Sequence, residues 1–203
     1  MRLPHGAPGS VNSTTAPPPR RGRHIALAIA GSGLILAGTS VSLIWVRGSS
    51  EARQSQYLSA VPVRVEFAAP ELALDDLAGG SGNLREFLGR VVLVNLWATW
   101  CPPCTQEMPV FQAFYTEHRS RGFAVLAIND GESAGAVRRF VEDWGMTFPV
   151  WLDPKYQASD HAFRTTGLPT SYVIDRAGTV RLMWIGAIDT SNLAEYLIPI
   201  LEE

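Results

Sequence analysis

The stretch VVLVNLWATWCPPCTQEMP, residues 91–109, decides the fold. Residues 91–97 form an apolar run rich in β-branched side chains, which predicts a strand buried on both faces. The segment from about residue 102 to 121 has apolar side chains at helical spacing and predicts a helix. The only two cysteines of the chain, Cys101 and Cys104, therefore lie where a buried strand ends and a helix begins.

The rest of the body alternates between strand and helix patterns. Further strands are expected at 123–129, 148–153, 170–175 and 179–185, and further helices at about 134–144, 156–163 and 190–201. The alternation of Val180, Leu182 and Trp184 predicts that one face of the hairpin formed by the last two strands is buried. Alternating strands and helices followed by a hairpin and a helix predict an α/β sandwich with a mixed sheet.

The N-terminal part has a different composition. Residues 1–23 are rich in Pro, Ser, Thr and Gly and are expected to be a disordered cytoplasmic tail. An uncharged apolar run from 25 to 46 would make a helix of about 33 Å, enough to cross a bilayer core of roughly 30 Å. We therefore expect a transmembrane signal anchor at 24–46. The alternative is a cleaved signal peptide, but its apolar region is usually about 7–15 residues. A lipoprotein would need a cysteine where Thr39 stands.

The flanking charges predict the orientation of this anchor. Three arginines, Arg20, Arg21 and Arg23, precede the apolar run, and only Arg47 and Arg53 follow it closely. Because the more positive flank stays in the cytoplasm, we expect a single-pass cell-membrane protein whose catalytic domain is extracytoplasmic. In that compartment, at the periplasmic or outer face, disulfides form and persist.

The polar segment 47–65 is expected to be a flexible linker with a span of about 25 Å, and 66–203 to be the folded domain. The formal net charge is −2, with 17 bases and 19 acids; five of the bases and none of the acids lie in the first 47 residues. The remainder is therefore acidic. A nucleic acid is excluded as a partner because phosphate binding needs clustered Lys and Arg.

Three hypotheses compete for Cys101 and Cys104. A structural disulfide would close so short a loop that it would gain little, and a domain of this size has ample core. A metal site would need more than two ligands, and no second C-x-x-C or H-x3–5-H pattern completes it. A copper site could borrow His118 or His161, although lone histidines on helices are more often ordinary surface or core residues. The third hypothesis is a redox pair.

The position of the pair favours redox chemistry. A sulfur at a helix N-terminus lies near unpaired backbone N–H groups, which can stabilise an anion by up to about 2 kcal/mol. This would lower the pKa of the Cys101 thiol from roughly 8.5 to around 7. Pro102 suits the first helical turn, and Pro103 removes another early donor, so both prolines bear on the reduction potential.

The motif Trp97-Ala98-x-Trp100-Cys101-x-x-Cys104 after an apolar strand resembles the thioredoxin superfamily. Together with GLPTSYVID and the lead-in APELALDDLAGG…LREFLGR, it resembles the membrane-anchored TlpA/ResA/CcmG branch of extracytoplasmic thiol–disulfide oxidoreductases, several of which serve cytochrome c maturation. The resemblance covers the chain from about Ala69 onward. It implies a thioredoxin-like fold with an N-terminal extension and a central αβ insertion, preceded by a single transmembrane helix, and no cofactor or metal.

The resemblance also implies roles for individual residues. Cys101 would be the exposed attacking thiol and Cys104 the buried resolving thiol. Pro169 matches the family's cis-proline, which lies against the disulfide, and the backbone of Leu168 would pair with the substrate. Trp100 is expected to shape and cover the site.

Acidic residues around the pair are further candidates. Asn95 departs from the thioredoxin pattern, which has a buried aspartate there as proton acceptor. Glu107 lies three residues after Cys104, hence on the same helix face, and is the candidate to replace that acid. The alternative is an ordinary first-turn acid favoured by the helix dipole. Glu132 matches another acid near the site in the same branch.

The expected function is reduction of disulfides in exported proteins, with recharging by a membrane electron donor of the CcdA/DsbD type and membrane attachment through residues 25–46. The oxidase direction would use the same residues. A peroxiredoxin-like peroxidase is an alternative, but that family needs Thr or Ser three residues before its cysteine, and Ala98 stands there. A copper- or haem-handling module is the non-enzyme alternative.

Overall fold

The structure, a computed structural model, describes residues 61–165 and 167–203. The expected tail at 1–23 and the expected anchor at 24–46 lie outside the described residues. Among the described residues, no helix combines the length and the apolar character needed to cross a bilayer.

Eight strands form one mixed sheet in the order β1-β8-β7-β4-β5-β6-β2-β3. The strands are β1 (Val63–Ala68), β2 (Ala73–Asp76), β3 (Ser81–Asn83), β4 (Val91–Trp97), β5 (Phe123–Asp130), β6 (Val150–Asp153), β7 (Thr170–Ile174) and β8 (Thr179–Ile185). The central strands β4, β5 and β6 are parallel, and β7 pairs antiparallel with β4. This arrangement confirms the expected mixed sheet.

The helices follow the strands in the expected order. They are α2 (Pro102–His118), α3 (Ala134–Asp143) and α4 (Thr190–Glu202), with short 3-10 turns η2 (Leu84–Phe87) and η3 (Arg119–Arg121) and a π-helical turn η4 (Gln157–Ala162). The order β4–α2–β5, then β7–β8–α4, is that of a thioredoxin-like fold. The strands β1–β3 form the expected N-terminal extension, and α3 with β6 the expected central insertion.

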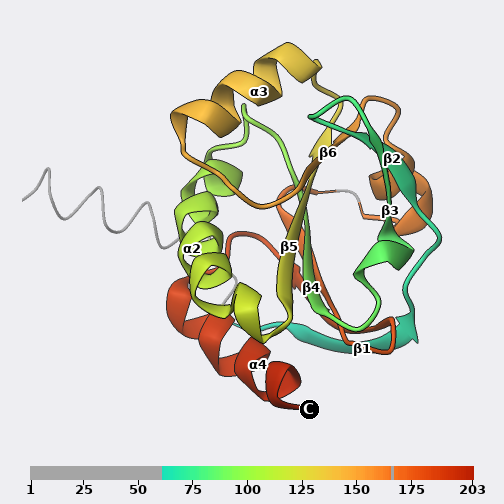
Figure 1. The fold of residues 1–203 in the computed structure, drawn as a ribbon, viewed down its shortest axis with the longest axis vertical. Coiled ribbons are helices and arrows are strands. Elements are labelled where there is room, and N and C mark those ends of the chain that lie inside the picture. The colour runs from blue at the N-terminus through green and yellow to red at the C-terminus, as the bar shows by residue number, and fades with distance from the viewer. Residues whose placement is uncertain (1–60, 166) are drawn as a thin grey trace, which may run out of the picture. The chain divides into compact units, whose positions relative to one another are not determined.

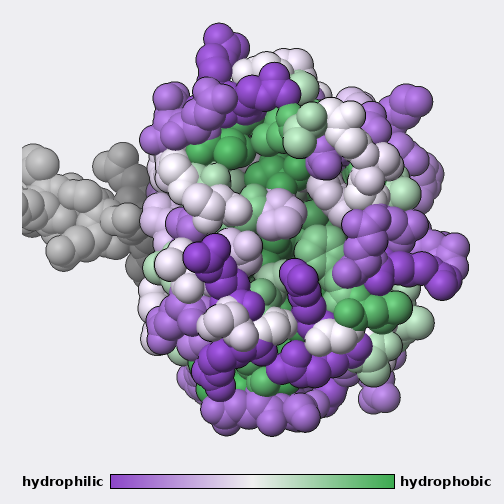
Figure 2. All heavy atoms as spheres, viewed as in Figure 1, coloured by the Kyte–Doolittle hydropathy of each residue, from purple (hydrophilic) through white to green (hydrophobic). Residues whose placement is uncertain are grey.

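The period of two along β4 divides the core into two layers. Val91, Leu93 and Trp97 pack with the apolar faces of α2 and α4, whereas the alternate residues Val92 and Val94 pack against the other layer. In Figure 1, α2 and α4 lie to the left of β5 and α3 lies above them, whereas β2 and β3, which end the sheet beyond β6, lie to the right. In the same view, apolar side chains gather between these two sides, with polar side chains around them (Figure 2).

One expectation was wrong in detail, and another holds for only one strand of the hairpin. Strand β1 begins at Val63, inside the expected linker at 47–65, and pairs antiparallel with β8. Nearly all its side chains are exposed, so it lacks the alternation that marks a half-buried strand. In β8, a register shift opposite Ile174 places Val180 in the second layer, while Leu182 and Trp184 face the helices. The predicted alternation along β8 is confirmed, because Val180, Leu182 and Trp184 are buried and the residues between them are only partly buried. Strand β7 is buried throughout, so the hairpin as a whole contributes side chains to both layers.

Candidate active site

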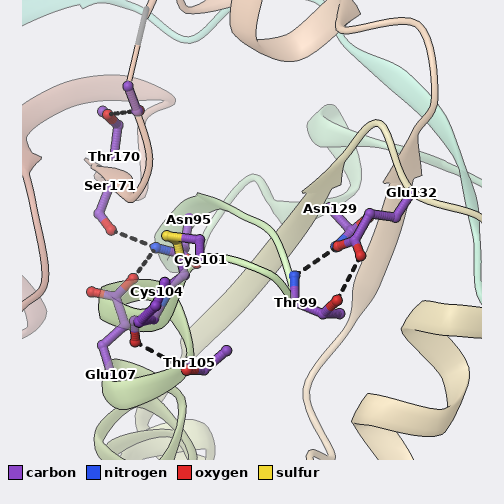
Figure 3. Close-up of a disulfide and its surroundings, with 12 residues drawn as sticks. Asn95, Thr99, Cys101, Cys104, Thr105, Glu107, Asn129, Glu132, Thr170 and Ser171 are labelled. Atoms are coloured by element: carbon purple, nitrogen blue, oxygen red, sulfur yellow. Dashed lines mark hydrogen bonds between the residues drawn. A yellow bond between two sulfur atoms is a disulfide. The ribbon is translucent and has the colours of Figure 1, made fainter.

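The two cysteines form a disulfide at the start of α2 (Figure 3). Cys101 is the N-cap residue with extended backbone, and Pro102 opens the helix. The backbone N–H of Thr105 donates to the Cys101 carbonyl at 3.1 Å and closes the first turn. Both sulfurs therefore lie at the helix N-terminus, where backbone dipoles stabilise a thiolate. This is the position that the sequence predicted.

The two cysteines differ little in exposure. The side chain of Cys104 is fully buried, and Cys101 is only 4% exposed. Cys101 is therefore the more exposed of the two, but it is not the exposed thiol that was expected. Trp100 is instead the exposed residue, at 68%. Trp100 lines the groove beside the disulfide. We had expected it to cover the site, but its own side chain is largely exposed.

A groove of about 540 Å³ opens beside the disulfide. Its lining comes from the start of α2, from the end of β5, from the η4 region and from the segment before β7: Trp100, Cys101, Pro102, Pro103, Asp130, Tyr156, Ser159, Asp160, Thr165, Gly167 and Leu168. Leu168 thus shares one hollow with Cys101, as the resemblance implied. The Leu168–Pro169 peptide bond is cis, as predicted.

Glu107 lies one turn below Cys104 and is 1% exposed. Its Oε1 accepts a hydrogen bond from Asn95 Nδ2 at 2.7 Å, and its Oε2 accepts one from the Ile188 backbone N–H at 3.0 Å. Asn95 also donates to Ser171 Oγ at 2.9 Å, because β4 and β7 place these two residues opposite each other. Figure 3 shows the chain of contacts from Ser171 through Asn95 to Glu107.

This environment changes the acid–base behaviour of Glu107. Burial raises the pKa of the Glu107 carboxyl to about 8, and the hydrogen bonds from Ile188 and Asn95 only partly offset it. The carboxyl therefore carries a proton at neutral pH. A pKa near that of an ordinary thiol suits proton exchange with Cys104 on the same helix face. Asn95 cannot act as the proton acceptor that the aspartate provides in thioredoxins. It donates a hydrogen bond to Glu107, whose carboxyl can accept a proton.

Glu132 lies near the site, but it contacts the loop before Cys101 and not the cysteines themselves. It does not hydrogen bond to either cysteine or to Glu107. Its Oε2 accepts from the Thr99 backbone N–H and from Asn129 Nδ2, both at 2.7 Å, and its Oε1 accepts from Thr99 Oγ1 at 2.6 Å. Because Thr99 lies two residues before Cys101, Glu132 fixes the loop that delivers Cys101 to the helix. It is a positioning residue.

We expect Glu132→Ala to lower the free energy of unfolding by about 2–4 kcal/mol, since three hydrogen bonds to a half-buried carboxylate are lost. Glu132→Gln is expected to recover part of this loss, because an amide oxygen still accepts from Thr99. Urea denaturation of the oxidised chain measures both. Glu142→Gln, an exposed acid of α3, is the matched control. Equal stability of all four proteins would contradict the positioning role.

The remaining candidates are not brought to the disulfide. His118 ends α2, where its ring packs on Phe114, far along the helix from Cys101. His161 lines a separate hollow with Glu71. Across 61–165 and 167–203, no group of three His, Cys, Asp or Glu side chains is placed to hold a metal ion.

Asp130, Tyr156 and Ser159 were missed by the sequence analysis. Asp130 could have been suspected from its place at the carboxyl end of a buried parallel strand, where ligand sites of α/β sheets gather. Tyr156 and Ser159 belong to the η4 region, whose backbone no local pattern indicates.

Comparison with known proteins agrees with this site. The model of the AhpC/TSA family matches residues 65–183. The thiol-disulfide oxidoreductase ResA of Geobacillus kaustophilus is 35% identical over 135 residues, which cover 66% of this chain and 77% of that protein. ResA of Bacillus subtilis is 36% identical over 129 residues, covering 64% and 72%.

The chain belongs to the ResA-like thiol-disulfide oxidoreductases of the thioredoxin superfamily.

Solved structures support the fold of this ResA-like enzyme. A protein of Chlorobium tepidum, described as a thiol:disulfide interchange protein DsbE, superposes with a TM-score of 0.63 at 31% identity. The match covers 67% of this chain and 96% of that one. A secreted thiol-disulfide isomerase of Corynebacterium glutamicum has a TM-score of 0.65 at 24% identity, covers 70% and 93%, and shows the fold alone.

The match to the AhpC/TSA model alone does not separate peroxidases from thiol–disulfide oxidoreductases. The residues of the site distinguish these two reactions. Ala98 stands where a peroxidase of the peroxiredoxin type needs Thr or Ser, and the buried Cys101–Cys104 disulfide supplies a dithiol pair. The chemistry of the site is therefore thiol–disulfide exchange.

Proposed function

We propose that this oxidoreductase works outside the cytoplasm and reduces disulfides of exported proteins. We include cytochrome c maturation among the processes that it serves. The observation that carries the proposal is the Cys101–Cys104 disulfide at a helix N-terminus, beside a groove and one turn from the proton-holding Glu107. The similarity to ResA supports the reaction class. The arginines before the expected anchor at 24–46 support the location.

The cycle starts from the reduced enzyme. The Cys101 thiolate attacks one sulfur of the substrate disulfide, forms a mixed disulfide and releases the other substrate sulfur as a thiolate. The Cys104 thiol then gives its proton to Glu107 in its carboxylate form, which is the minority form at neutral pH because the pKa is about 8, and attacks Cys101 Sγ. The second substrate sulfur leaves as a thiolate and takes up a proton. Two electrons have passed to the substrate, and the enzyme holds a disulfide beside protonated Glu107.

The oxidised structure fits the end of this cycle. Its carboxyl has a pKa of about 8 and is protonated at neutral pH, as the product of proton transfer from Cys104 should be. When a donor reduces the enzyme, the same proton can return to the leaving Cys104 thiolate. We propose a membrane electron donor of the CcdA/DsbD type for this step, since residues 24–46 would hold the domain beside it.

A thiol reagent that cannot cross membranes tests location and direction together. We expect it to label Cys101 in intact cells freed of any outer membrane, without prior reductant, because an extracytoplasmic reductase rests in its dithiol form. Labelling measured by mass spectrometry only after lysis would contradict the location. Labelling only after added reductant would contradict the reductase direction. A Cys101→Ser, Cys104→Ser double variant is the control for background.

A further inference from the structure

Asp130 is the last residue of β5 and lines the groove that also holds Cys101. It is 6% exposed, yet its Oδ1 atom has no hydrogen-bond partner among the described residues. The hydroxyl of Ser159, which lines the same groove and is also buried, lies near enough to lower the pKa of Asp130, but no hydrogen bond of standard geometry joins the two side chains. Buried polar groups in proteins are nearly always well paired, so these two side chains have room for a further partner in the groove.

The neighbouring Asp153 shows that a buried acid in this region can have hydrogen-bond partners for both of its oxygens. Asp153 lies opposite Asp130 on β6 and is fully buried. Its two carboxylate oxygens accept the backbone N–H groups of Gln157 and Ala158, at 2.8 and 2.6 Å, and so hold the start of η4. Asp153 therefore has a structural role that satisfies it, and Asp130 has none.

The charge around Asp130 is uncompensated. Asp160 lines the same groove, and none of the ion pairs between described residues includes Asp130 or Asp160. The pKa of Asp130 is raised to about 6: burial raises it most, the Ser159 hydroxyl lowers it, and the charges of Asp153 and Asp160 raise it. A bound cation would relieve this repulsion. A metal ion is a poor fit, because the described acids form no cluster able to hold one.

The rest of the groove suits a long side chain. Trp100 and Tyr156 are both exposed aromatic residues that line it, and aromatic faces pack against aliphatic stems and attract cations. The Tyr156 hydroxyl lies against Gly131, where an added Cβ would come within 2.1 Å of it. Tyr156 is thus packed onto the residue that follows Asp130. One of the two aromatic side chains of the groove therefore lies near the Asp130 carboxylate.

We propose that this groove binds a lysine or arginine side chain of the polypeptide substrate, next to the cysteine that Cys101 attacks. The carboxylates of Asp130 and Asp160 and the Ser159 hydroxyl accept hydrogen bonds from the cationic group, and its aliphatic stem lies along Trp100 and Tyr156. Asp130 is then a specificity-determining residue. This inference rests on the proposed reductase function and names the class of substrate that the site prefers.

The test uses three synthetic peptides that differ at one position beside their single cysteine, which carries a mixed disulfide with glutathione. That position is lysine, norleucine or glutamate, and the second-order rate constant for reduction of each peptide is measured in a single turnover of the full-length reduced chain. We expect the lysine peptide to react about tenfold faster than the norleucine peptide, and the glutamate peptide more slowly than both. In Asp130→Asn the lysine-to-norleucine ratio is expected to fall to about 2 or less.

Asp143→Asn, on α3 outside the groove, is the matched control and is expected to keep the ratio. A ratio of 1 in the wild-type chain, or a full ratio in Asp130→Asn, would overturn the inference and leave the reductase function standing. Failure to reduce any of the peptides would overturn both. If Asp130→Asn does not fold, the lysine-to-norleucine ratio of the wild-type chain is compared at low and high salt. A preference that rests on charge must fall as salt rises, and a ratio that does not change would overturn the inference.

Discussion

Cys101→Ser is expected to lose essentially all thiol–disulfide exchange, by at least about 1,000-fold, because a hydroxyl at the helix N-terminus cannot form the attacking thiolate. Cys104→Ser is expected to lose turnover as well but to keep the first step, since Cys101 still attacks. The two variants therefore have equal steady-state activity and different single-turnover behaviour. Reduction of a disulfide-bearing protein, followed with the purified full-length chain, measures both.

The matched control for these variants is Thr105→Ser, which keeps a hydroxyl beside the disulfide and both thiols. It should retain turnover within about threefold of the wild type, since surface-type changes of this size cost little. Substantial turnover in Cys101→Ser would show that Cys104 can attack on its own. That result would contradict the assigned roles.

Glu107→Gln is expected to slow resolution of the mixed disulfide by about 100-fold or more at neutral pH, the usual contribution of a positioned general base. The amide oxygen can accept from only one of Asn95 and Ile188, and the amide cannot take the Cys104 proton. The rate of resolution, measured by acid quench and mass spectrometry, should then rise with pH as Cys104 ionises unaided. Glu117→Gln, an exposed acid further along α2, is the control. An unchanged rate would contradict the base role.

The same substitution should change how stability depends on pH. Burial raises the pKa of this carboxyl from its ordinary value of 4.5 to about 8 in the folded oxidised chain, so the folded state binds the extra proton between these values. The stability of the wild type should therefore fall, relative to Glu107→Gln, as the pH rises from about 4.5 to 8, by roughly 3–5 kcal/mol. Urea denaturation across this range measures it, and a constant difference between the two proteins would contradict the buried, raised carboxyl.

The parts of the site that depend on local pattern were predictable from sequence. The apolar run of β4 and the following helical spacing place Cys101 at a helix N-terminus without any tertiary information. The i+3 spacing likewise places Glu107 and Cys104 on one helix face. In each case the position of the residue is set by the geometry of one helix or by the junction of two elements that are consecutive in the sequence.

Other contacts depend on how distant elements pack, and no local pattern contains them. Asn95 meets Ser171 only because β4 and β7 pair in one register. Glu132 could be placed near the site by resemblance, but its partner Thr99 depends on how two loops meet at the sheet edge. The Asp130 groove depends on η4, whose N-cap residue Tyr156 has a left-handed backbone that is uncommon for this residue type. Strand β1 was missed because an exposed edge strand resembles a linker.

The central claim is that Cys101 attacks the substrate and Cys104 resolves the mixed disulfide. Its most direct measurement is the mass of the covalent intermediate formed by each single-cysteine variant with a disulfide-bearing peptide, mapped to the residue by peptide digestion. The account predicts a stable adduct on Cys101 in Cys104→Ser, and none in Cys101→Ser over the same time. An adduct on Cys104 in Cys101→Ser that forms as fast, or no adduct in either variant, would contradict it.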